Sequence, residues 1–149
     1  MKNSVLITGV HGFCGRHLAT RLIAEEMDVY GADIHLDPPT SLSLKGYFRM
    51  DIKDPSNVND VIHSVVPDMI FHLAGLTVAE ASEVYHVNFL GSVYLLEAIR
   101  KWVPQASVLM VGSAAEYGYV AEDEMPICET HPCNPITPYG ISKHGMVLA

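Results

Sequence analysis

The sequence predicts an α/β fold with a doubly wound parallel sheet, in which helices cover both faces of the strands. The first strand candidate, residues 5–8, is an apolar run without alternation, as expected for a strand buried on both faces. Similar runs recur along the chain, and segments with helical spacing separate most of them. A chain of 149 residues, 49% of them hydrophobic, fits one globular domain. Right-handed crossovers then give the strand order 3-2-1-4-5, with a ligand crevice at the carboxyl ends of the strands.

The expected strands and helices follow one another in order. Strands are expected at residues 5–8, 28–33, 47–50, 69–72 and 108–111, and helices at 15–26, 55–66, 82–102 and 138–149. Asp54 is a candidate N-cap for the second helix, Pro55 fits its first turn, and Pro67 stops it. The Pro- and Ser-rich residues 34–46 are expected to form an irregular loop.

Three glycines follow the first strand and precede the first helix, a context that indicates dinucleotide binding. Gly9 allows the tight turn, and Gly12 lets a pyrophosphate approach the backbone at the positive end of the helix. Gly15 lets that helix pack close to the strand.

Acidic residues end the second and third strands. Asp33 can accept hydrogen bonds from the adenosine ribose hydroxyls and would repel a 2′-phosphate, which favours NAD over NADP. Arg16 points the other way, because its guanidinium could hold a 2′-phosphate, although an exposed helix arginine is the simpler interpretation. Asp51 could meet the adenine amino group while Ile52 covers the ring; the alternative for Asp51 is an acid that leads into a helix.

The fourth strand ends in small residues. Leu73, Ala74 and Gly75 would allow the backbone to come close to a cofactor. His72, just before them, is interpreted as a packed strand-end residue.

Tyr139 and Lys143 lie four residues apart at the start of the last helix and therefore share a face. A tyrosine, with an ordinary pKa of about 10, is a weak acid–base group unaided, and a nearby ammonium stabilises its phenolate. Ser113, at the end of the fifth strand, could hydrogen-bond the same substrate oxygen. Alone, such a pair would be an ordinary surface pair; downstream of a nucleotide fold it indicates catalysis.

Composition excludes several other classes of function. The net charge of −8 argues against nucleic acid and anionic membranes as partners. No apolar run approaches the ~20 residues that span a bilayer, and residues 1–4 lead straight into the first strand without a secretory signal. Three cysteines suit a reducing compartment, so a cytoplasmic location is expected. Cys128 and Cys133 with His131 lack a second ligand pair, so no metal site is expected.

Together these residues resemble the extended short-chain dehydrogenase/reductases of the NAD-dependent epimerase/dehydratase family, whose nucleotide-binding part is a Rossmann fold. The matching positions are spread over nearly the whole chain: Thr8, Gly9, Gly12, Phe13, Gly15, Asp33, Asp51–Ile52, His72–Gly75, Asn88, Gly91, Gly112–Gly118 and Pro138–Lys143.

The resemblance implies roles for these residues. Tyr139 would be the acid–base residue, Lys143 would bind the nicotinamide ribose and tune Tyr139, and Ser113 would orient the substrate oxygen. Asn88 would support the helix geometry and a proton relay. Phe13, Asn88 and Tyr139 would also belong to the cofactor site. The cofactor would be NAD, with NADP as the alternative, and the substrate a nucleotide-diphosphate sugar.

Two departures from the family pattern narrow this expectation. Family dehydratases carry an acidic pair where this chain has Ala114 and Ala115, so a 4,6-dehydratase is disfavoured. The pattern is closer to reductases of 4-keto-6-deoxy sugars, including GDP-4-keto-6-deoxymannose reductases, with a 4-epimerase close behind. Only six residues follow Lys143, so residues 1–149 are expected to be the NAD(P)-binding domain without the family's C-terminal substrate domain.

Two functional hypotheses follow. In the first, the chain is the cofactor-binding and catalytic half of a reductase or 4-epimerase, inactive on sugar nucleotides by itself and homodimeric through its last helices. In the second, it is a non-catalytic dinucleotide-binding module.

Overall fold

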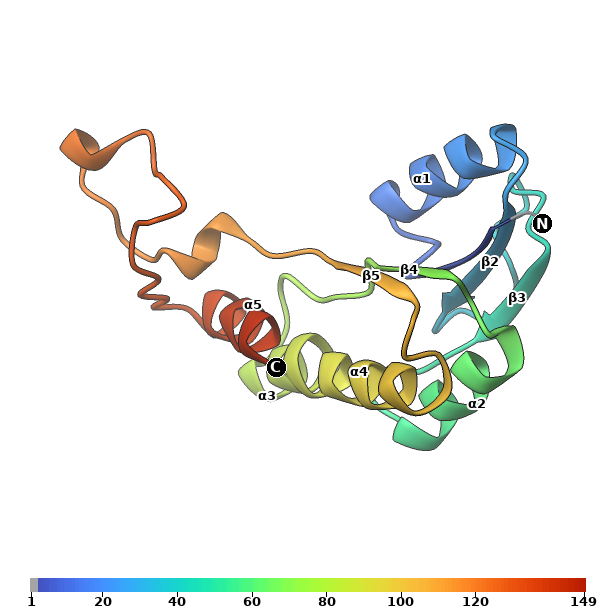
Figure 1. Ribbon diagram of the computed structural model, residues 1–149. Helices are drawn as coiled ribbons and strands as arrows, with labels where there is room; N and C mark the ends of the chain where they lie inside the picture. The colour runs from blue at the N-terminus through green and yellow to red at the C-terminus, as the bar shows by residue number, and fades with distance from the viewer. Residues whose placement is uncertain (1–2) are drawn as a thin grey trace.

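Five parallel strands form one sheet in the computed structural model, which describes residues 3–149 (Figure 1). The strands are β1 (Ser4–Thr8), β2 (Asp28–Asp33), β3 (Gly46–Arg49), β4 (Met69–His72) and β5 (Ser107–Met110). Their spatial order is β3-β2-β1-β4-β5, which confirms the predicted topology. β3 and β5 each begin one residue earlier than predicted, because Gly46 pairs with Tyr30 and Ser107 pairs with Met69.

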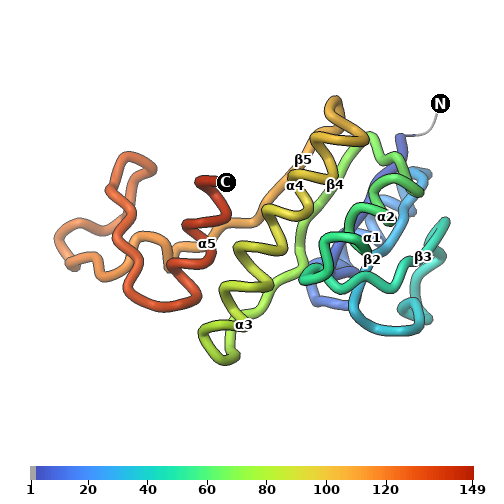
Figure 2. The backbone as a smooth tube through the Cα atoms, turned by 90° about the horizontal axis from the view of Figure 1, so that it is seen from below, coloured from blue at the N-terminus to red at the C-terminus, as the bar shows by residue number. Residues whose placement is uncertain are grey.

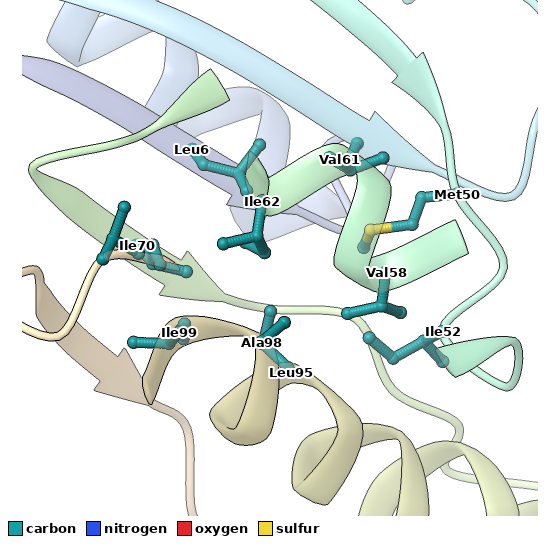
Figure 3. Packing of buried hydrophobic residues seen from close by; sticks show 12 residues of the cluster. Leu6, Met50, Ile52, Val58, Val61, Ile62, Ile70, Leu95, Ala98 and Ile99 are labelled. Carbon is teal, nitrogen blue, oxygen red and sulfur yellow. The ribbon is translucent and has the colours of Figure 1, made fainter. Parts of the chain in front are cut away.

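Helices cover both faces of this sheet (Figure 1). Helix α1 (Phe13–Ala24) lies on one face, and α2 (Pro55–Val65) and α4 (Gly91–Trp102) lie on the other. The alternation of β1 creates the two cores, since successive side chains of a strand point to opposite faces. Val5 and Ile7 pack in the α1 core, whereas Leu6 packs with α2 and α4 (Figure 3). All three side chains are fully buried, which explains why this strand lacks a polar face.

Local signals set the ends of α2 as predicted. The Asp54 carboxylate accepts hydrogen bonds from the backbone N–H groups of Ser56 at 2.9 Å and Asn57 at 3.2 Å. Pro55 occupies the first helical turn, where a missing N–H costs nothing. The helix ends at Val66, which adopts a left-handed conformation with φ of 47° directly before Pro67.

The helix predicted over residues 82–102 is present but interrupted. It consists of α3 (Ala81–Tyr85), a π-helical turn over His86–Leu90, and α4. The backbone stays right-handed through both junctions, at His86 and at Gly91. The predicted helical stretch is therefore confirmed, and the wider turn within it is a detail that the apolar spacing does not indicate. Asn88 lies within it, and π turns often mark functional sites.

The chain after β5 departs from the sheet. Short 3-10 turns at Ala114–Glu116 and Glu122–Glu124 are followed by α5 (Pro138–Leu148), which the Thr137 side chain caps. This segment, orange to red in Figures 1 and 2, extends sideways beyond the strands. Helix α5 returns to pack against α3, the π-helical turn and the first 3-10 turn. Within residues 3–149, no helix is both long and apolar enough to cross a bilayer.

Candidate functional site

The turn between β1 and α1 requires glycine at its first position. Gly9 has a φ of 73°, which non-glycine residues rarely adopt, and its N–H donates to the Ala32 carbonyl at 2.8 Å. A Cβ on Gly9 would also lie 2.7 Å from the backbone nitrogen of Ala74. The turn therefore packs closely against the two residues that follow β4, and the predicted tight turn is confirmed.

Gly15 and Gly12 differ in their surroundings. Gly15 is buried, and a Cβ there would overlap the Gly9 carbonyl oxygen and lie 2.8 Å from the Val10 Cα. Gly12 is exposed at the N-cap of α1, where a Cβ would meet only the Gly9 oxygen, at 3.1 Å. Gly15 thus allows close packing of α1, as predicted, while Gly12 leaves its outer side open to an approaching ligand.

A cleft of about 400 Å³ lies at the carboxyl ends of the strands, directly beside this turn. It is lined by most of the residues predicted to bind a cofactor: Gly9, Gly12, Asp33, Asp51, Ile52, Leu73, Ala74 and Gly75. A cleft at this edge is where ligands bind in doubly wound sheets. Phe13 follows Gly12 at the start of α1 but does not line this cleft. It is 74% exposed, and its ring packs edge-on against His17.

Two histidines that the sequence pattern did not indicate as site residues hold Asp33 at the cleft wall. One carboxylate oxygen accepts the backbone N–H of His11 at 3.0 Å, and the other accepts the His35 Nδ1–H at 2.7 Å. Burial alone would raise the pKa of Asp33, but these hydrogen bonds outweigh burial and hold its pKa below the ordinary value. Asp33 is therefore a fixed anion at neutral pH. The His11 and His35 rings stack with centroids 4.4 Å apart and also line a second hollow that includes Arg16.

The third strand delivers Asp51 and Ile52 to the same cleft. Asp51 accepts the Lys53 backbone N–H at 3.0 Å, and Ile52 is 6% exposed and packs mainly into the core beside Gly91. Lys53 also pairs with Glu83 at 3.1 Å, which places charged groups of both signs on the rim.

A buried hydrogen-bond chain runs behind the cleft through His72. The Ser92 hydroxyl donates to the Asn88 carbonyl at 2.7 Å, so His72 Nε2–H donates to Ser92 Oγ at 3.1 Å. His72 Nδ1 is then the acceptor for the Thr8 hydroxyl at 2.7 Å. Burial, and secondarily the charge of Lys143, lower the pKa of His72 to about 4. His72 is accordingly a neutral, packed strand-end residue, as the sequence indicated.

Asn88 connects three segments around the π-helical turn. Its side-chain amide forms a pair of hydrogen bonds with the backbone of Leu76, both at 2.8 Å. Its Nδ2–H also donates to the Ser142 hydroxyl on α5 at 3.1 Å. Because Leu76 lines the cleft and Ser142 is next to Lys143, Asn88 links the cleft to the helix that carries Tyr139 and Lys143.

Ser113 opens the short turn after β5, and Glu116 fixes its position. The Glu116 carboxylate accepts the Ser113 backbone N–H at 2.6 Å, while Ser113 Oγ accepts the Ala115 N–H at 3.2 Å. Gly140 on α5 packs so closely on this turn that a Cβ would overlap the Ala115 carbonyl. The neighbouring Tyr139 therefore starts its helix beside the Ser113 turn.

Lys143 is unusual because its ammonium group is buried and has only a weak hydrogen-bond acceptor in place of water. Lys143 is 7% exposed, and its Nζ donates a hydrogen bond to the Met146 sulfur at 3.5 Å. Sulfur is a weak acceptor, and burial lowers the pKa of Lys143 while the nearby Glu116 charge opposes that shift. Such an ammonium is suited to donate to hydroxyl groups of a bound ligand.

Comparison with known proteins supports one family. The family model described as "NAD dependent epimerase/dehydratase family" matches residues 5–148. The GDP-6-deoxy-D-mannose reductase of Pseudomonas aeruginosa is 32% identical over an alignment that covers 96% of this chain and 44% of that protein. The chain thus spans less than half the length of this relative.

Solved structures show the same partial coverage. The structure of UDP-glucose 4-epimerase from Thermus thermophilus in complex with NAD aligns with a TM-score of 0.84 at 29% identity, covering 97% of this chain and 49% of that chain. The structure of RMD from Pseudomonas aeruginosa complexed with NADPH aligns with a TM-score of 0.76 at 29% identity, covering 97% and 46%. This protein therefore belongs to the NAD-dependent epimerase/dehydratase family.

Proposed function

We propose that the cleft binds a nicotinamide dinucleotide, NAD(H) in preference to NADP(H). The observation that carries this proposal is the glycine turn beside Asp33: an exposed Gly12 at a helix N-terminus and a fixed carboxylate share one cleft. The pyrophosphate would lie over Gly12, where backbone N–H groups and the helix dipole favour an anion. The adenosine ribose would donate its hydroxyl protons to Asp33.

The preference for NAD follows from charge. Asp33 stays ionised at neutral pH because its pKa is lowered by the hydrogen bonds from His11 and His35. A 2′-phosphate would meet this carboxylate directly, and like charges at close range are strongly unfavourable. Arg16 offers a countercharge, but its exposed position on α1 gives it little field in water.

We further propose that Tyr139, Lys143 and Ser113 carry out a redox reaction at a sugar carbon. The cofactor would supply hydride transfer when bound. Tyr139 would exchange the proton of the reacting oxygen, and Ser113 would donate a hydrogen bond to that oxygen. The buried ammonium of Lys143 would bind the nicotinamide ribose hydroxyls and stabilise the phenolate of Tyr139. The hydrogen-bond chain Thr8–His72–Ser92–Asn88 would keep the cofactor cleft and the helix that carries Tyr139 and Lys143 in a fixed arrangement.

The proposed substrate is a nucleotide-diphosphate sugar, and the proposed reaction is reduction or epimerisation at C4. Relatives named as a reductase and as a 4-epimerase support both activities about equally. Dehydration is disfavoured because Ala114 and Ala115 carry no group able to transfer a proton. Since the chain covers less than half of these relatives, turnover is proposed for a full-length protein, and residues 1–149 alone are expected to act poorly on sugar nucleotides.

We also infer a homodimer in a reducing compartment such as the cytoplasm. Helix α5 carries exposed apolar residues, Ile141, Val147 and Leu148, which suit an interface. The three cysteines are free and exposed, as is common where thiols stay reduced.

The test uses a full-length protein and a panel of GDP-, UDP- and dTDP-sugars with NAD(H) and NADP(H). We expect Tyr139→Phe to lower kcat by at least about 100-fold, in the range of general acid–base catalysis, with little change in cofactor Kd. Wild-type turnover by Tyr139→Phe would refute the mechanism. Cofactor binding without turnover of any sugar would instead favour the non-catalytic binding module.

A further inference from the structure

We propose that Glu116, Cys133 and His144 form a binding site for a divalent transition-metal cation, with zinc as the best match. One ligand atom from each of the three side chains lies within 4.8 Å of the others. These residues come from different segments: the turn after β5, the loop before α5, and α5 itself. The site is separate from the cofactor cleft, whose lining includes none of them.

The Glu116 carboxylate is positioned to offer one oxygen to a cation. Its Oε1 accepts the Ser113 N–H at 2.6 Å, which fixes the orientation of this buried side chain. Its Oε2 faces His144 Nδ1 at 3.6 Å, too long for a hydrogen bond. Two ligands held about 2.0–2.1 Å from a tetrahedral zinc are separated by about 3.4 Å, so the spacing is close to that of a metal site.

The His144 side chain presents an unpaired nitrogen to the same place. Its Nδ1 atom is buried and has no hydrogen-bond partner among residues 3–149. Buried polar atoms are nearly always paired, because burial removes the hydrogen bonds to water that an unpaired atom would otherwise make. A cation between Nδ1 and Oε2 would satisfy both atoms.

Cys133 decides the kind of cation. A thiolate, an imidazole and a carboxylate together are a zinc-type donor set, whereas calcium and magnesium prefer oxygen ligands alone. Cys133 is exposed and free, so the cation has an entry path from solvent. Three protein ligands would leave a fourth position for water.

A cation at this site would link the turn that presents Ser113, the loop that contains Cys133, and the helix that carries Tyr139 and Lys143. It would thereby stabilise the position of α5 without touching the reacting atoms. The spacing of residues in the sequence does not predict this site. Cys133 lies near Glu116 and His144, which are distant in sequence, and not with the neighbouring Cys128 and His131.

The test is titration of the reduced, chelator-treated chain with Co²⁺ and then Zn²⁺. We expect one equivalent of Co²⁺ to give a thiolate-to-cobalt charge-transfer band in the near ultraviolet, and Zn²⁺ to displace it. At a free concentration 100 times its Kd, Zn²⁺ should raise Tm by about 5–10 °C. Cys133→Ser should abolish the band and weaken metal binding at least about 100-fold, whereas Cys128→Ser, in the same exposed loop, should leave both unchanged.

The variant Glu116→Gln is a second test of the metal site. Its amide oxygen can still accept the Ser113 N–H, while the anionic ligand is lost. It should weaken binding without removing the thiolate band at saturating metal. Absence of the band in the wild-type chain would overturn the proposal, as would its survival in Cys133→Ser or its loss in Cys128→Ser. Circular dichroism of each metal-free variant verifies folding, and the exposed Cys133 keeps the test decisive even if Glu116→Gln fails to fold.

Discussion

His72 should make the fold lose stability on acidification in a defined pH window. Its pKa is about 4 in the folded protein, against 6.5 for an ordinary histidine. The folded state keeps His72 neutral, and the unfolded state binds the proton first as pH falls. Stability from the neutral side chain is therefore intact above pH 6.5, declines between pH 6.5 and 4, and changes no further below that. A difference of about 2.5 pH units corresponds to about 3 kcal/mol.

The variant His72→Gln isolates this contribution. Glutamine can still donate to Ser92 but does not titrate, and it leaves the Thr8 hydroxyl without its acceptor. At pH 7 we expect the variant to be less stable by about 1–3 kcal/mol. The difference in the free energy of unfolding between variant and wild type should shrink as pH falls to 4.5. Only the wild type loses stability on acidification from keeping His72 neutral in the folded state.

The assay is urea unfolding at pH 7.0, 6.0, 5.0 and 4.5, with the free energy of unfolding extrapolated to water. His17→Gln, an exposed histidine on α1, is the matched control and should parallel the wild type at every pH. Parallel curves for wild type and His72→Gln would refute the assignment of a neutral, buried imidazole in the Thr8–Ser92 chain.

Two further predictions test the wall of the cleft and a helix end. Asp33→Asn removes the anion proposed to face the ribose, so NAD should bind at least about tenfold more weakly and its affinity advantage over NADP should narrow. Calorimetric titration with both cofactors measures the two Kd values. An unchanged ratio of these Kd values would show that Asp33 does not discriminate between the cofactors. Asp54→Ala removes the acceptor for the Ser56 and Asn57 N–H groups and should cost about 1 kcal/mol, with cofactor Kd unchanged. No loss in urea unfolding would contradict the capping role.

The fold was predictable because the decisive signals are local. β1 needs apolar residues in succession because Val5 and Leu6 face different cores, and that run is visible in the sequence. Gly15 and Asp54 each act within a few residues of their own position, so their roles could be inferred from neighbours alone. The strand order followed from general handedness rules.

The rest depends on contacts between distant segments. His11 and His35 meet at Asp33 only because the turn after β1 approaches the end of β2. Phe13, which is predicted to belong to the cofactor site, has an exposed side chain at the first turn of α1 and does not line the cleft. Asn88, in the wide turn, forms side-chain hydrogen bonds with Leu76 and Ser142, which lie 12 and 54 residues away, and no apolar pattern encodes such bonds.

Calorimetric titration of the chain with NAD⁺, using wild type and Gly12→Val, tests the central claim most directly. Gly12 has a φ of −65°, which valine adopts readily, and a Cβ there would meet only the Gly9 carbonyl oxygen, at 3.1 Å. A shift of a few tenths of an ångström relieves this contact, so we expect valine to preserve the fold and to lower Tm only slightly. Its side chain would occupy the surface proposed for the pyrophosphate. We predict one equivalent of NAD⁺ bound by the wild type and at least about tenfold weaker binding by Gly12→Val. Equal affinities, or no binding by the folded wild type, would contradict the assignment of this cleft as a dinucleotide site.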